Sequence, residues 1–80
     1  MNTGKTKKIV ATFATTSDAI QAETLCKEAG VEGRLIPTPS DISAGCGLAF
    51  MMPPSEEPRF CAAIEGHLTP EGYFERMLRG

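Results

Sequence analysis

The middle of the chain contains the segment IPTPSDISAGCG, whose prolines and glycines separate two apolar segments. Pro37 and Pro39 fix the backbone φ angle and remove two amide donors, which excludes a regular helix or a central strand here. Gly45 and Gly47 flank Cys46 and lack a Cβ, so the backbone can adopt positive φ and bring amides close to the sulfur. Amides directed at an anion stabilise a thiolate. Cys46 is therefore either a reactive thiol on a shaped loop or a small apolar residue in a tight turn.

Length and composition indicate a single domain over residues 1–80. The chain is 41% hydrophobic and 22% charged, which is typical of a globular protein. The formal net charge is −2, and the lysines near the N-terminus give no basic face, so we expect no binding to nucleic acid. No apolar segment is long enough to cross a membrane and no targeting segment is recognised, so we expect a cytoplasmic protein without membrane association.

The three cysteines are at positions 26, 46 and 61, without Cys-x-x-Cys spacing and without a histidine at metal-binding spacing. Neither a disulfide framework nor a metal site is predicted, and no cofactor is expected. Cys26 and Cys61 fall on the apolar stripes of two expected helices. We therefore expect both to be buried and unpaired.

Hydrophobic periodicity predicts three strands and two helices. The strands are expected at residues 8–14, 31–36 and 47–52, and the helices at 17–29 and 55–67. Hydroxyl side chains at Thr15, Thr16 and Ser17 can cap the first helix, and Gly30 can end it. His67 is expected near the end of the second helix, where a positive charge suits the helix dipole. Residues 72–78 fit a strand or a helix, and the local pattern leaves both open. The order of the elements favours the α+β arrangement of ferredoxin-like folds.

The chain resembles the family called putative selenium/sulfur carrier protein-like. The resemblance covers about residues 8–73 and rests on a strand that ends in Phe13, a helix that carries A-x-x-A-E, and the segment LIPTPSDISAGCGLA. Its most specific part is a Pro-x-Pro followed seven residues later by Cys-Gly. The matching positions are Pro37, Pro39, Ser43, Cys46 and Gly47. Members are small bacterial proteins, and the resemblance implies a final strand at residues 72–78, which completes a ferredoxin-like β-α-β-β-α-β two-layer sandwich.

The family resemblance implies a carrier of sulfur or selenium. Cys46 would then take the chalcogen from a persulfide or perselenide on a donor protein and present it to an acceptor protein. The amides of Gly45 and Gly47 and the Ser43 hydroxyl could stabilise its thiolate. Arg34 could add positive charge, or could be a solvated strand residue. Sulfur-carrier proteins place their cysteine before a Pro-x-Pro, whereas here the Pro-x-Pro comes first.

Two other classes of function remain open. In the first, the protein is a non-catalytic interaction or regulatory module that docks through the rigid Pro-x-Pro loop. In the second it is a conventional enzyme, but no paired carboxylates or phosphate loop support that, and Asp41 is interpreted as an N-cap or turn residue. Open sheet edges on a small domain also make a homodimer possible.

Overall fold

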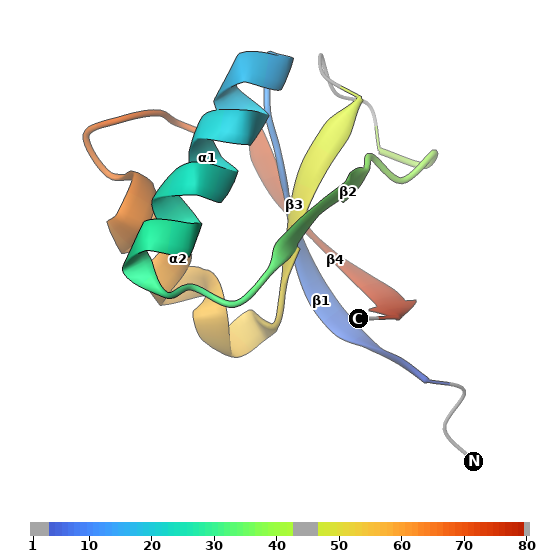
Figure 1. Ribbon diagram of the computed structural model, residues 1–80. Helices are drawn as coiled ribbons and strands as arrows, with labels where there is room; N and C mark the ends of the chain where they lie inside the picture. The colour runs from blue at the N-terminus through green and yellow to red at the C-terminus, as the bar shows by residue number, and fades with distance from the viewer. Residues whose placement is uncertain (1–3, 43–46, 80) are drawn as a thin grey trace.

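The computed structural model describes residues 4–42 and 47–79, and its elements follow the order β-α-β-β-α-β (Figure 1). The strands are β1 (Lys5–Thr12), β2 (Arg34–Pro37), β3 (Leu48–Met52) and β4 (Gly72–Arg79). The helices are α1 (Thr16–Ala29) and α2 (Glu57–Ile64), with a 3-10 turn η1 (Pro54–Glu56) before α2. The prediction of an α+β fold is confirmed, and residues 72–78 are part of a strand.

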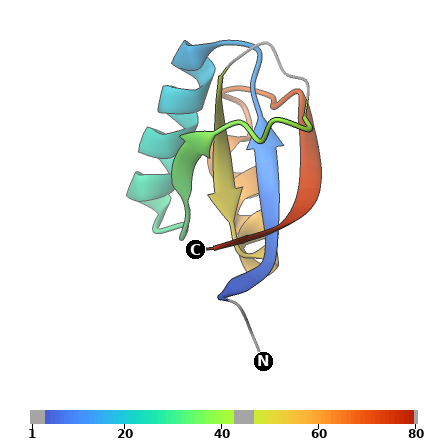
Figure 2. The ribbon, with the colours of Figure 1, turned by 90° about the vertical axis from the view of Figure 1, so that its right-hand side faces the viewer.

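The four strands form one antiparallel sheet in the order β2-β3-β1-β4. Both helices lie on the same face of this sheet (Figures 1 and 2). Successive side chains of a strand point to opposite faces. Ile9 and Ala11 therefore pack toward the helices, whereas Val10 packs on the other face with Ala49. The centre of the sheet is thus buried on both sides.

Helix α1 begins and ends where the sequence predicts. The Thr15 hydroxyl accepts a hydrogen bond from the Asp18 amide at 3.1 Å, which satisfies one of the free amides of the first turn. Gly30 follows the last residue with φ 74°, a left-handed conformation that favours glycine. The Val31 amide then donates to the Cys26 carbonyl at 2.9 Å and closes the end of the helix.

Helix α2 is shorter than predicted. It ends at Ile64 instead of residue 67, because Gly66 adopts φ 82° and turns the chain away from the helix axis. His67 therefore lies beyond the helix, and its amide donates to the Ile64 carbonyl at 2.9 Å. The expectation that His67 sits in the last helical turn was wrong, and Gly66 is the stop signal that accounts for it.

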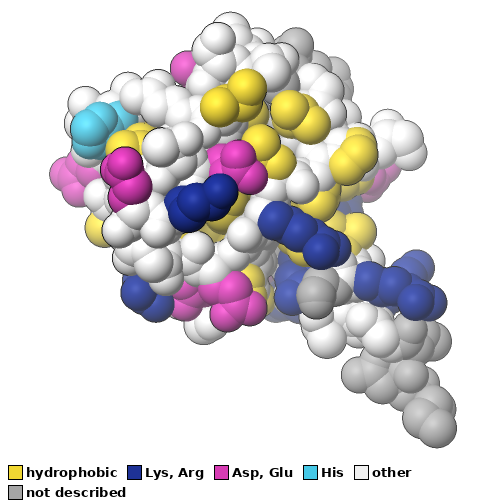
Figure 3. All heavy atoms as spheres, in the orientation of Figure 1, with side chains coloured by type: hydrophobic (Ala, Val, Ile, Leu, Met, Phe, Trp, Pro, Cys, Tyr) yellow, Lys and Arg dark blue, Asp and Glu magenta, His cyan; other side chains and the backbone are white. Residues whose placement is uncertain are grey.

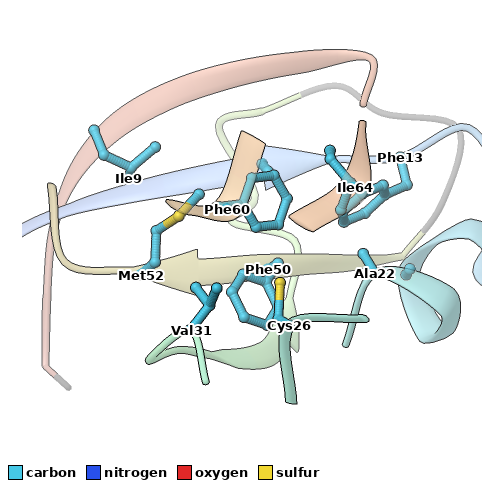
Figure 4. Packing of buried hydrophobic residues seen from close by; sticks show 11 residues of the cluster. Ile9, Phe13, Ala22, Cys26, Val31, Phe50, Met52, Phe60 and Ile64 are labelled. Carbon is cyan, nitrogen blue, oxygen red and sulfur yellow. The ribbon is translucent and has the colours of Figure 1, made fainter. Parts of the chain in front are cut away.

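The main core lies between the sheet and the two helices and is built around aromatic rings (Figure 4). Phe50 of β3 and Phe60 of α2 stack with ring centroids 5.3 Å apart, and Tyr73 of β4 meets Phe60 edge-on at 6.1 Å. Stacked and edge-on aromatic pairs stabilise a fold by more than the hydrophobic free energy of the surface area that they bury. Cys26 of α1 is 1% exposed and points toward Phe50, as its place on the apolar stripe of α1 predicts.

Candidate functional site

The Pro-x-Pro segment leads out of β2 and crosses the face of the sheet that the helices leave uncovered (Figure 2). Pro37 is the last residue of β2, an edge strand, where a missing amide donor costs no sheet hydrogen bond. The Thr38 amide donates to the Gly47 carbonyl at 2.9 Å, and the Ile42 amide donates to the Pro39 carbonyl at 3.0 Å. The first bond ties the two ends of the loop together, and the second folds its first half into a turn.

Ile42 anchors the loop by burial. Its side chain is 7% exposed and belongs to a second apolar cluster with Val10 and Ala49 on the uncovered face of the sheet. Ile36, Phe74 and Leu78 pack around this cluster. An apolar side chain buried between polar residues holds a loop more firmly than hydrogen bonds to water-exposed groups do. The loop is therefore part of the fold up to residue 42.

Asp41 adds an ion pair beside this anchor. Its Oδ2 accepts from Arg76 Nε of β4 at 2.7 Å, and the Arg76 guanidinium lies 5.6 Å from the ring centroid of Phe74. Asp41 lies in the turn that the hydrogen bond from Ile42 to Pro39 closes, so its interpretation as a turn residue is confirmed, and the ion pair is an addition to it. In the strand register, Phe74 is opposite Val10. Arg76 follows Phe74 by two residues on β4, so both side chains lie on the face of the sheet that the loop covers. Sequence spacing could not show this contact, because 35 residues separate the partners.

The predicted site residues fall into two groups. Pro37, Pro39 and Gly47 lie at the base of the loop, where the contacts above hold them. Ser43, Gly45 and Cys46 lie outside the described residues.

Two details at the predicted site differ from expectation. Gly47 has no positive φ, and a Cβ built on it meets nothing within 4 Å, so the described backbone does not require glycine at this position. Arg34 begins β2 and therefore lies at the opposite end of that strand from the loop. It is thus not placed to add charge beside the loop.

The two thiols in the described residues have contrasting environments. Cys26 is buried under the helices, and burial raises the pKa of its thiol to about 11. Cys61 is exposed, so the prediction that it is buried was wrong. Phe60 and Ile64 occupy the inward stripe of α2, and Cys61 is turned about 100° away from Phe60 around the helix axis. Cys61 was assigned to the core because it is an apolar residue directly after Phe60, which is a core residue.

The exposed thiol lies beside a phenol. Cys61 Sγ and Tyr73 Oη are 3.5 Å apart, within hydrogen-bond distance. Burial raises the pKa of Tyr73, and the hydrogen bond to Cys61 and the electrostatic interactions with Cys61 and Glu57 raise it further. The Tyr73 hydroxyl therefore stays protonated at neutral pH and is able to donate to the sulfur. Sequence analysis missed this pair, because the separation of 12 residues connects a helix to an edge strand by tertiary packing alone.

Serine replacements test the two environments. Cys26→Ser is expected to destabilise the protein by about 1–3 kcal/mol, because it puts a hydroxyl into an apolar core that offers no dedicated hydrogen-bond partner. Cys61→Ser is expected to change the free energy of unfolding by less than about 0.5 kcal/mol, since its hydroxyl stays in solvent and keeps the contact with Tyr73. Chemical denaturation of both variants measures the difference. Equal losses in the two variants would contradict the assignment of Cys61 to the surface.

Other site types find no support in the described part of the chain. No three His, Cys, Asp or Glu side chains within residues 4–42 and 47–79 gather closely enough to hold a metal ion. Among the same residues, neither helix is long and apolar enough to cross a membrane.

Comparison with known proteins gives one match. No curated protein and no solved structure matches the chain. A family model, described as "Putative Se/S carrier protein-like", matches residues 8–75, which include both helices, the Pro-x-Pro loop and the first half of β4. Because this match spans most of the 80 residues, the chain belongs to the Se/S carrier protein-like family.

Proposed function

We propose that the protein carries sulfur or selenium on Cys46. The Cys46 thiolate attacks the terminal chalcogen of a persulfide or perselenide on a donor protein. The bond between that chalcogen and the donor sulfur breaks, the donor leaves as a thiolate, and Cys46 holds the persulfide or perselenide. An acceptor protein then attacks the same terminal atom and restores the Cys46 thiolate. Each step transfers a neutral chalcogen atom, so no outside oxidant or reductant is needed.

The observation that carries this proposal is the fixed base of the loop. Ile42 is buried a few residues before Cys46, and the Gly47 carbonyl directly after it accepts from Thr38. These fixed points lie on both sides of the segment that carries Cys46, and a carrier needs such a fixed base for contact with two proteins in turn. We further propose that the amides of Gly45 and Gly47 and the hydroxyl of Ser43 stabilise the thiolate.

We also propose a ferredoxin-like topology for this scaffold. In the observed order β2-β3-β1-β4, β3 separates β1 from β2, and β1 separates β3 from β4. Each helix therefore connects two strands with one antiparallel strand between them, as split β-α-β units do. The order leaves β2 and β4 as edges, and edge-to-edge pairing remains the most direct route to a homodimer.

Thiol chemistry tests the carrier function directly. Cys46 is expected to be alkylated faster than Cys61 and Cys26 at neutral pH, because a stabilised thiolate has a pKa below the ~8.5 of a free cysteine. After treatment with glutathione persulfide, mass spectrometry of peptides should find one added sulfur on Cys46. Cys46→Ala should abolish this loading and leave the melting temperature nearly unchanged.

Cys61→Ala is the matched control, since it removes a thiol that is exposed in the structure. Loading is expected to be unchanged in this variant. If Cys46 reacts no faster than Cys61, or if Cys46→Ala still accepts the sulfur, the carrier proposal is wrong.

A second candidate is a docking module that uses the Pro-x-Pro loop without chemistry. The ion pair between Asp41 and Arg76 and the burial of Ile42 favour it, because they hold residues 37–42 as a rigid surface. On this alternative, Cys46→Ala leaves partner binding intact, whereas changes at the exposed Pro37 weaken it.

A further inference from the structure

Positive charge is concentrated on the sheet. Of the eight lysines and arginines, Lys27 lies on α1 and Arg59 on α2. The other six are on strands: Lys5, Lys7 and Lys8 on β1, Arg34 on β2, and Arg76 and Arg79 on β4. Figure 3 shows dark-blue side chains gathered on the side of the molecule where β1 begins and β4 ends. The fold thus builds a basic region that the linear sequence, with its net charge of −2, does not suggest.

The strand register makes this arrangement costly. Lys5 is opposite Arg79, and Lys8 is opposite Arg76, and like charges in directly opposed positions destabilise a sheet. The positive charge of Arg76 is compensated by its ion pair with Asp41. Within residues 4–42 and 47–79, neither Lys8 nor Arg34 takes part in an ion pair. Among these residues no carboxylate pairs with either cation, so both are available to bind an anion.

Lys8 and Arg34 line the same cavity. It has a volume of about 190 Å³ and lies where β2 begins and β3 ends. Met51 is paired with both Arg34 and Val10, and Lys8 is two residues before Val10 on the same face. The two cations therefore flank β3 from its two neighbouring strands. Met51 and Pro53 supply apolar lining, and Glu32 adds one carboxylate at the edge.

We propose that this cavity binds a small carboxylate with a short aliphatic part. Two cations and one carboxylate leave one positive charge, which matches a monoanion. An arginine guanidinium binds a carboxylate with two parallel hydrogen bonds, and lysine adds a point charge. The apolar lining from Met51 and Pro53 suits a short hydrocarbon chain. At about 30 Å³ per water, the cavity has room for about six non-hydrogen atoms.

This site is separate from the thiol loop. The loop leaves β2 at Pro37 and returns to β3 at Leu48, whereas the cavity is lined by Arg34 and Met51 near the other ends of these strands. Binding in the cavity and loading of Cys46 are therefore independent, and each proposal is able to fail without the other.

Methyl NMR with butyrate as the probe tests the site. Sodium butyrate is titrated against sodium chloride at constant ionic strength, with the methionine methyl groups labelled. The Met51 signal is expected to shift saturably, with a dissociation constant on the order of 1 mM for a ligand of this size. The Met77 signal is the internal control, because this side chain is 60% exposed on β4 and does not line the cavity.

Charge removal identifies the binding groups. Lys8→Gln and Arg34→Gln are each expected to weaken butyrate binding about three- to tenfold, as the loss of one charge-assisted contact does. Lys27→Gln removes a cation from α1 and should bind butyrate as the unchanged protein does. Without ligand, Lys8→Gln should melt at the same or a higher temperature, because it relieves the repulsion with Arg76.

Three results would overturn the proposal. In the first, the Met51 signal shifts as much with sodium chloride as with sodium butyrate. In the second, the Lys8→Gln and Arg34→Gln variants bind butyrate as tightly as the Lys27→Gln variant does. A stronger saturable shift with inorganic phosphate than with butyrate would also rule out a carboxylate with an aliphatic part. Cys46→Ala, which removes the proposed carrier thiol, should leave the titration unchanged.

Discussion

Replacing Gly33 by alanine is expected to destabilise the protein by about 2–4 kcal/mol, a loss that a chain of this size cannot easily tolerate. Gly33 lies just before β2 with φ 155°, which side chains rarely adopt. A Cβ built there collides with the ring of Phe50 and lies 2.6 Å from the Met51 carbonyl oxygen. Phe50 is stacked on Phe60 in the core, so its ring has no free space in which to move.

Gly47→Ala is the matched control for this experiment. Gly47 also lies next to a strand, but a Cβ there meets nothing within 4 Å and its φ is not positive. The free energy of unfolding of the Gly47→Ala variant is expected to differ from that of the unchanged protein by less than about 0.5 kcal/mol. Thermal and chemical denaturation of both variants provide the comparison. Similar melting temperatures for the two would mean that β2 can shift away from Phe50, and the close approach at Gly33 would then not be essential.

Most helices and strands of the fold can be predicted from local sequence patterns. The apolar run that ends at Phe13, the cap at Thr15 and the glycine at position 30 are each determined by neighbours within a few residues. Such signals are strong because hydrogen bonds and helix periodicity act over short distances. The strand over residues 72–78 is different. Its alternating pattern fits both a strand and a helix, and the choice depends on pairing with β1, which is distant in the sequence.

The contacts of the loop could be predicted only in part. Pro37 and Pro39 predict an irregular segment, and the structure has one over residues 38–42, although Pro37 itself is still the last residue of β2. Ile42 is the only large apolar residue between Pro39 and Leu48, and this could have identified it as an anchor. The ion pair of Asp41 with Arg76 could not have been found, because it requires the loop to cross from β2 to β4. The exposure of Cys61 depends equally on where α2 lies over the sheet.

Truncating the loop anchor, Ile42→Ala, is expected to cost about 2–3 kcal/mol of stability. Ile42 is nearly fully buried against Val10 and Ala49, and removing such a side chain loses its transfer free energy and leaves a cavity. The value is placed at the low end of the range for this change, because a loop can partly collapse into the space. Asp41→Asn, at the neighbouring exposed ion pair, should cost less than about 1 kcal/mol.

Ile20→Ala is the matched control for the anchor. Ile20 has the same side chain but is 51% exposed on α1, so its truncation is expected to change stability by less than about 0.5 kcal/mol. Denaturation curves of the two isoleucine variants therefore measure burial, with the chemistry of the change held constant. Equal losses would show that Ile42 does not hold the loop on the sheet.

The same variant connects the anchor to the proposed carrier thiol. If the fixed base of the loop maintains the amides around Cys46, Ile42→Ala should slow the alkylation of Cys46 at neutral pH about three- to tenfold under conditions where the variant stays folded. The alkylation rate of Cys61 should not change, because its surroundings on α2 and β4 do not include the loop. A Cys46 rate that is unaffected by the loss of Ile42 would mean that residues 43–47 set the reactivity of the thiol by themselves. The anchor would then stabilise the fold without taking part in the chemistry.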